Sequence, residues 1–89
     1  MAFRIEFEPG ARRSLDKIHS TERDRILRFL RDRIAPADNP RTLGDALQGK
    51  RFKGQWKYRV GDHRVIARIN DGIMIVTVID IGHRSAVYR

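Results

Sequence analysis

One stretch of the sequence, residues 55–69, constrains the fold more than any other. Apolar residues alternate there with basic and polar ones, and the alternation is interrupted once, at Gly61-Asp62. Alternation with a period of two is the pattern of a β-strand with one buried face, and a Gly-Asp pair between two such runs is typical of a hairpin turn. The stretch therefore predicts a β-hairpin with strands over 52–60 and 63–69.

The charged positions of this hairpin are expected on a single face of the sheet. Because side chains alternate along a strand, Trp56 and Tyr58 should face a core, and the basic residues should face away from it. These basic residues are Lys57, Arg59, Arg64 and Arg68. Like charges on neighbouring strands repel one another and weaken strand pairing, so a cationic face of this kind is typical of a surface that binds an anion.

The N-terminal part of the chain predicts one strand and two helices. Residues 2–7 alternate in the same way, and the Pro-Gly pair that follows shortly afterwards ends the strand. Apolar residues spaced by three and four then predict an amphipathic helix over 9–18. A second helix is expected to begin at Thr21, whose spacing to Asp24 suits a capping box, and to end at Pro36.

The remaining segments predict a surface loop and a central strand. Residues 36–51 are rich in turn-forming residues and are expected to form a loop, with one helical turn at 43–47. Asn70-Asp71-Gly72 predicts a second tight turn, and the run 73–81 is apolar on both faces, as in a central strand. The fold class is therefore α+β: an N-terminal strand beside the last strand, a two-helix hairpin, and a three-stranded antiparallel meander. The helices are expected to pack on one face of the sheet and to leave the other face open.

The charge of the chain indicates its partners. The 89 residues carry a net charge of +8 and are expected to form a single domain, 1–89. Residues 1–45 carry ten basic and eight acidic residues (net +2), whereas residues 46–89 carry nine and three (net +6). No apolar run approaches the roughly 20 residues of a membrane span, so a cytoplasmic protein without a membrane partner is expected. A basic protein of this kind is expected to bind nucleic acid first and an acidic protein second.

The sequence also restricts the chemistry. It contains no cysteine, no HExxH motif, no metal-ligand spacing of His, Asp and Glu, and no glycine-rich phosphate loop, so we expect neither a metal nor another cofactor. Cations with one imidazole and one phenol are sufficient to cleave RNA through its own 2′-hydroxyl. A base accepts the hydroxyl proton, cations stabilise the phosphorane, and an acid protonates the leaving oxygen. The residues expected to form this site are Lys57, Arg59 and Arg64 of the hairpin and His83, Arg84 and Tyr88 after it.

Two motifs are similar to those of a known toxin family. They are Trp56-Lys57-Tyr58-Arg59-Val60-Gly61-Asp62-His63-Arg64-Val65-Ile66 and Ile81-Gly82-His83-Arg84-Ser85-Ala86-Val87-Tyr88. With the opening strand, the helix hairpin and the loop that follows it, they make the chain resemble the RelE toxins of the RelE/ParE superfamily, the small bacterial ribosome-dependent mRNA interferases of toxin–antitoxin modules. The resemblance implies a microbial RNase-like fold, cleavage of mRNA in the ribosomal A site, and neutralisation by a cognate antitoxin in a hetero-oligomer.

The resemblance also implies a role for most of the site residues. Lys57 and Arg59 match the paired cations of the second strand, and Arg64 matches the arginine that binds phosphate. Arg84 matches the arginine that stabilises the transition state. Tyr88 matches the tyrosine that stacks on the substrate or deprotonates it.

Two positions depart from the family pattern. RelE proteins often carry Lys where this chain has Arg59, and some carry Lys where it has His83. The assignment of general acid and base among Lys57, His83 and Tyr88 therefore stays open.

Other functions are compatible with the same scaffold. A ParE-like poison of DNA gyrase needs a basic surface but no acid–base pair, and Arg84 and Tyr88 argue against it. A degenerate toxin that retains only partner binding is a third alternative. Neither the codon preference nor the identity and stoichiometry of the antitoxin can be predicted from the sequence.

Overall fold

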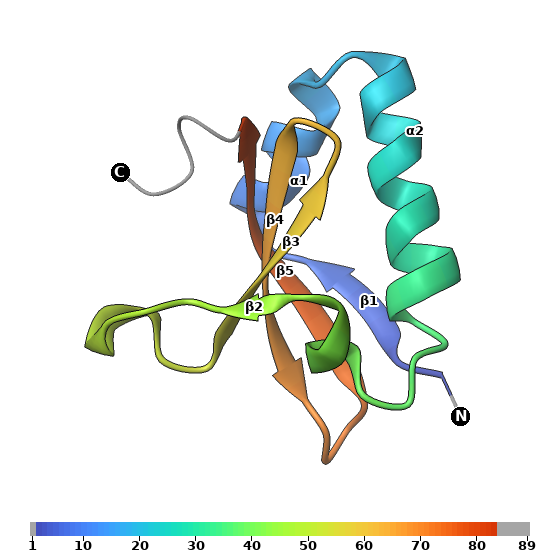
Figure 1. Ribbon diagram of the computed structural model, residues 1–89. Coiled ribbons are helices and arrows are strands. Elements are labelled where there is room, and N and C mark those ends of the chain that lie inside the picture. The colour runs from blue at the N-terminus through green and yellow to red at the C-terminus, as the bar shows by residue number, and fades with distance from the viewer. Residues whose placement is uncertain (1, 84–89) are drawn as a thin grey trace.

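The computed structural model describes residues 2–83, in which a sheet is flanked by two helices (Figure 1). The strands are β1 (Arg4–Phe7), β2 (Asp45–Ala46), β3 (Gln55–Val60), β4 (His63–Asn70) and β5 (Ile75–His83). The helices are α1 (Pro9–Lys17) and α2 (Ser20–Phe29), with a π-helical turn at Leu30–Ile34 and 3-10 turns at Pro40–Leu43 and Lys50–Phe52. No helix within residues 2–83 is long and apolar enough to cross a membrane.

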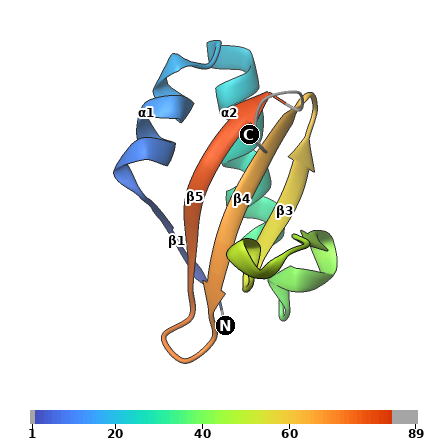
Figure 2. The ribbon, with the colours of Figure 1, turned by 90° about the vertical axis from the view of Figure 1, so that its left-hand side faces the viewer.

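The five strands form one sheet in the order β1-β5-β4-β3-β2. Strands β3, β4 and β5 make an antiparallel meander, and β1 lies beside β5 in parallel orientation. Both helices pack on the same side of this sheet, α1 against β1 and β5 and α2 against β3 (Figures 1 and 2). The predicted α+β fold, with helices on one face and the first strand beside the last, is confirmed. We call the opposite side of the sheet the open face.

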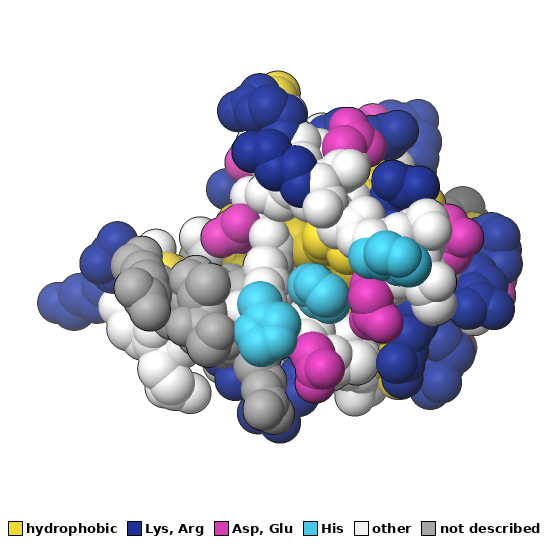
Figure 3. Space-filling view, turned by 90° about the horizontal axis from the view of Figure 1, so that it is seen from above, with side chains coloured by type: hydrophobic (Ala, Val, Ile, Leu, Met, Phe, Trp, Pro, Cys, Tyr) yellow, Lys and Arg dark blue, Asp and Glu magenta, His cyan; other side chains and the backbone are white. Residues whose placement is uncertain are grey.

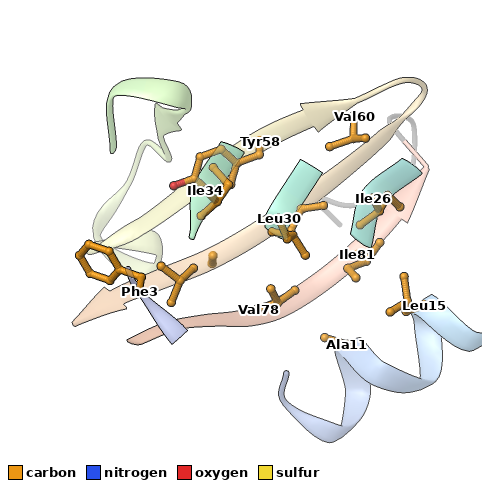
Figure 4. Close-up of a cluster of buried hydrophobic side chains, with 13 residues drawn as sticks. Phe3, Ala11, Leu15, Ile26, Leu30, Ile34, Tyr58, Val60, Val78 and Ile81 are labelled. Carbon is orange, nitrogen blue, oxygen red and sulfur yellow. The ribbon is translucent and has the colours of Figure 1, made fainter. Parts of the chain in front are cut away.

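The core lies between the sheet and the two helices (Figure 4). It contains alternate residues of the strands, among them Tyr58, Val65 and Val78, none of which is exposed. Trp56 is half buried and packs against this cluster, so the prediction that both aromatic residues of the hairpin belong to the core is confirmed. Burial of large apolar side chains of this kind is the main contribution to the stability of a small domain.

Helix α2 begins one residue earlier than the sequence predicts. The helix starts at Ser20, and the backbone N–H of Thr21 donates a hydrogen bond to Nδ1 of His19, 3.3 Å away. The predicted capping box of Thr21 and Asp24 is therefore wrong, because the imidazole of His19 satisfies the free N–H group at the helix start. At the other end, the π-helical turn is closed by a 2.8 Å hydrogen bond from Ala35 N–H to the carbonyl of Leu30.

The long connection between the helices and the meander is anchored to the sheet. The predicted helical turn at 43–47 is wrong: Pro40–Leu43 forms a 3-10 turn, and Asp45–Ala46 pairs with β3 as a short edge strand. The hydroxyl of buried Tyr58 donates a 2.8 Å hydrogen bond to the carbonyl oxygen of Pro40. Gly44 lies against the same ring, where an added Cβ would come within 2.7 Å of a ring carbon, so only glycine allows this close approach.

Strand boundaries shift by two or three residues from those predicted. The second predicted strand, 52–60, begins at Gln55 because the 3-10 turn Lys50–Phe52 occupies its start. The last one, predicted over 73–81, runs from Ile75 to His83, because the turn of the β4–β5 hairpin extends to Met74, which has a positive φ of 53°.

Candidate active site on the open face of the sheet

The β3–β4 hairpin positions the first part of the site. Val60 pairs with His63 across the two-residue turn Gly61-Asp62, and Gly61 has a φ of +61°. Glycine at the first central position is what a type II′ hairpin turn requires. Because this turn fixes the register, Arg59 lies directly opposite Arg64.

The same register places three predicted site residues on the open face. Tyr58 and Val65 are buried on the helix side, so their neighbours in the strand point the other way. Arg59 is exposed, whereas Lys57 and Arg64 are half buried. Arginines at directly opposed positions of two strands repel each other, and an anion such as a phosphate bound between them relieves this repulsion. The structure thus brings Lys57, Arg59 and Arg64 together as the sequence predicts.

His83 occupies a different place from these cations. It pairs with His63 at the end of the sheet, and the two imidazole rings meet edge to face with their centroids 5.9 Å apart. Nδ1 of His63 lies 3.8 Å from a carboxylate oxygen of Glu22 in α2, so this pair lies on the helix side of the sheet. Seen from this end, the histidine side chains lie near one another and next to acidic groups (Figure 3). The structure does not bring His83 into the row that Arg59 and Arg64 form.

The other two predicted residues, Arg84 and Tyr88, lie outside the described residues 2–83. Their roles remain those that the resemblance implies. Within the described part of the chain, no group of three or more His, Cys, Asp or Glu side chains is arranged to hold a metal ion.

The open face also contains an apolar area that the sequence did not reveal. Ile66, which the alternation places among the cations, is only 4% exposed. It contributes to a pocket of about 240 Å³ beside the loop that contains Leu47 and Phe52. The pocket is lined by Glu8, Leu47, Phe52, Gln55, Ile66, Ile79 and Asp80. No periodic signal could have found it, because two of its walls come from the irregular connection before β3.

A second basic area lies at the edge of the sheet next to α2. Four arginines line a depression of about 400 Å³ there: Arg25, Arg28, Arg33 and Arg59. The rest of its lining is Phe29, Asp32, Val60 and Gly61. No ion pair within residues 2–83 involves any of these four, since Asp32 is paired with Arg31 at 2.7 Å. Arg59 therefore joins the open face to a cationic surface on the helix side.

Two further groups near the site have structural roles. Burial raises the pKa of Tyr58 to about 12, against a smaller opposite effect of the nearby Arg41 cation, so its phenol stays protonated and serves as a hydrogen-bond donor. Arg68 on β4 is neutralised by Glu8, whose carboxylate lies 2.6 Å from its guanidinium. Arg68 is therefore less available to an anion than Arg59 is.

Comparisons with known proteins identify the family. A model of the family described as the ParE toxin of the type II toxin–antitoxin system parDE matches residues 5–88. No protein with a curated description has a sequence that matches this chain.

Several solved toxin–antitoxin complexes share the fold. The RelBE2 complex of Mycobacterium tuberculosis matches with a TM-score of 0.84 and 24% identity, over 94% of this chain and 100% of that one. The RelE–RelB complex of Pyrococcus horikoshii matches with a TM-score of 0.75 and 22% identity, over 97% and 99%. The intact RelBE complex of Escherichia coli matches with a TM-score of 0.69 and 19% identity, over 92% and 96%. With the family match over residues 5–88, the chain belongs to the RelE/ParE superfamily of type II toxin–antitoxin toxins.

Proposed function

We propose that this toxin is a metal-independent, ribosome-dependent endoribonuclease that cleaves mRNA in the ribosomal A site and so inhibits translation. The observation that carries the proposal is the direct opposition of Arg59 and Arg64 on the open face. Arginine side chains that start from opposed positions can both reach one phosphate, and their planar guanidinium groups stabilise the charge that develops on it during cleavage.

The reaction is attack of the 2′-hydroxyl on the adjacent phosphate, with loss of the 5′-oxygen of the next nucleotide. Lys57 lies on the same face as the two arginines and is the nearest candidate for the base. His83 lies on the helix side at the end of the sheet, away from the arginine row, so Tyr88, beyond it in sequence, is the second candidate for the acid or base. Arg84, by resemblance, stabilises the transition state. The ribosome supplies the orientation of the RNA that so small a site does not provide.

We propose a cognate antitoxin as the second partner, in a toxin–antitoxin hetero-oligomer. Three of the solved structures with the same fold are RelBE toxin–antitoxin complexes. An apolar pocket of about 380 Å³ between β1 and α2, lined in part by Phe3, Ile5 and Leu27, offers a surface for an apolar segment of such a partner. The net charge of +8 favours an acidic partner, and both partners of the toxin would be met in the cytoplasm.

The proposal is tested by removing the arginine pair. We expect Arg59→Ala/Arg64→Ala to abolish growth arrest and to reduce mRNA cleavage in cells by about a hundredfold or more, because the developing phosphorane charge is no longer compensated. The matched control is Arg12→Ala/Arg13→Ala on α1, which removes the same charge from an exposed helix surface and should retain activity. Circular dichroism verifies folding. Full toxicity of a folded Arg59→Ala/Arg64→Ala protein would sink the proposal.

A second candidate is a ParE-like poison of DNA gyrase, which the ParE description of the matching family favours. Mapping of RNA ends in cells that express the toxin separates the two. Codon-phased cuts within coding regions support the nuclease. Intact mRNA together with an induced DNA-damage response supports the gyrase poison.

A further inference from the structure

The pocket on the open face is lined by two acids and by no basic residue. Asp80 lines it, and no residue within 2–83 forms a hydrogen bond or an ion pair with this carboxylate. The other acid of the pocket, Glu8, is already neutralised by Arg68 at 2.6 Å. A carboxylate next to a phosphate site repels the phosphate and weakens its binding. We therefore expect Asp80 to interact with another part of the ligand.

An irregularity of β5 brings Asp80 to this position. Ala67 pairs with Val78 and Ile66 pairs with Asp80, so Ile79 is an extra residue without a partner in β4. A bulge of this kind turns two successive side chains toward one face of the sheet and is common next to functional sites. Both Ile79 and Asp80 line the open-face pocket as a result.

The pocket lies within reach of a nucleotide held by the arginine pair. Lys57, Ile66 and Asp80 form one row across the sheet, and Arg59, Arg64 and Gly82 form the next row. Rows on one face are two residues apart, which is about 7 Å. A phosphate at the arginine row therefore leaves the base of the same nucleotide next to the pocket.

The composition of the pocket suits an unpaired base. Ile66 and Ile79 contribute apolar surface, Gln55 contributes an amide, and Phe52 contributes an aromatic ring over which the guanidinium of Arg51 lies at 5.2 Å. Splayed bases of single-stranded RNA are bound in this way, by stacking on aromatic rings and by hydrogen bonds to their edges.

We infer that this pocket binds one unpaired nucleobase of the RNA and that Asp80 determines which base it prefers; the inference rests on the proposed nuclease function. A carboxylate only accepts hydrogen bonds. Guanine presents two adjacent N–H donors on its Watson–Crick edge and pairs with both carboxylate oxygens. Adenine and cytosine present one amino group, and uracil presents a single N–H between two carbonyl oxygens that repel the carboxylate. The order of preference is therefore guanine first and uracil last.

The substitution Asp80→Asn tests the inference in cells. An amide presents a donor as well as an acceptor, so the excess of guanine over uracil at one position next to the mapped cleavage ends should fall about tenfold, the size of one lost bidentate base contact. The matched control is Asp62→Asn in the β3–β4 turn, which removes the same charge at an exposed position and should leave the base preference unchanged. An unchanged base preference in an active Asp80→Asn toxin overturns the inference.

If the wild-type toxin makes no RNA cuts, the proposed nuclease function is refuted. The binding of nucleotides to the pocket can then still be measured directly. In two-dimensional ¹H–¹⁵N NMR spectra, guanosine monophosphate should shift the amide signals of Ile66, Ile79 and Asp80, and uridine monophosphate should shift them several-fold less. Equal or absent shifts overturn the inference. If Asp80→Asn weakens the binding of an antitoxin but leaves the discrimination between the two nucleotides intact, the pocket belongs to the partner interface and the inference is wrong.

Discussion

The two faces of the β3–β4–β5 meander differ sharply although they share one backbone. On the helix side, Tyr58, Val65 and Val78 are fully buried and the phenol has its hydrogen-bond partner. On the open face, Arg59 and Arg64 lie opposite each other, at a cost to strand pairing. The helix side is arranged for packing, and the open face is where we propose that a phosphate binds.

This difference means that stability and activity depend on alternate residues of the same strands. A substitution on the helix side should lower the free energy of unfolding, whereas one on the open face should leave it nearly unchanged. Three measurements of the free energy of unfolding test this division.

The largest effect is expected for Ile26→Ala on α2. Ile26 is 0% exposed within the core, so its truncation leaves a cavity against the sheet and should lower the free energy of unfolding by about 2–5 kcal/mol. The matched control is its neighbour Leu27, 37% exposed, for which Leu27→Ala should cost less than about 1 kcal/mol. Chemical denaturation measures both variants. Equal losses would contradict the assignment of the core to the side of α2 that carries Ile26.

A smaller, pH-dependent effect is expected for Tyr58→Phe. The lost hydrogen bond to Pro40 should cost about 1 kcal/mol at neutral pH. Since the pKa of Tyr58 rises from 10.0 to about 12 in the folded protein, its contribution is fully present below pH 10 and is lost as the pH rises through 12. The stability difference between the wild type and Tyr58→Phe should therefore shrink across this window. A difference that stays constant from pH 9 to about pH 12 would show that the phenol is not desolvated.

The smallest effect is expected for Arg59→Ala on the open face. Removal of one of two opposed cations relieves repulsion, so the free energy of unfolding should change by less than about 0.5 kcal/mol or increase slightly. Because salt screens this repulsion, the gain should be larger in dilute buffer than in concentrated salt. Thermal unfolding at two salt concentrations measures it. A loss above about 2 kcal/mol would place Arg59 among the residues that maintain the fold.

The extent to which the sequence predicted the fold varied with the kind of signal. The alternation of residues 55–69 correctly predicted a hairpin and the shared face of Lys57, Arg59 and Arg64, because the period of two is a property of the backbone itself. Signals that depend on one or two side chains were less reliable. The capping box at Thr21 was wrong because His19, a residue rarely considered as a cap, occupies the helix start.

The sequence alone predicted which face of the β3–β4 hairpin is buried and which face carries the basic residues, and its family motifs predicted an anion site on the basic face. Only the tertiary structure decided that β1 joins β5 in parallel, that His83 pairs with His63 at the helix side, and that a bulge brings Asp80 next to Ile66. The physical reason is that alternation is local, whereas strand pairing, bulges and the burial of Ile66 beside the loop before β3 depend on contacts between segments far apart in the chain.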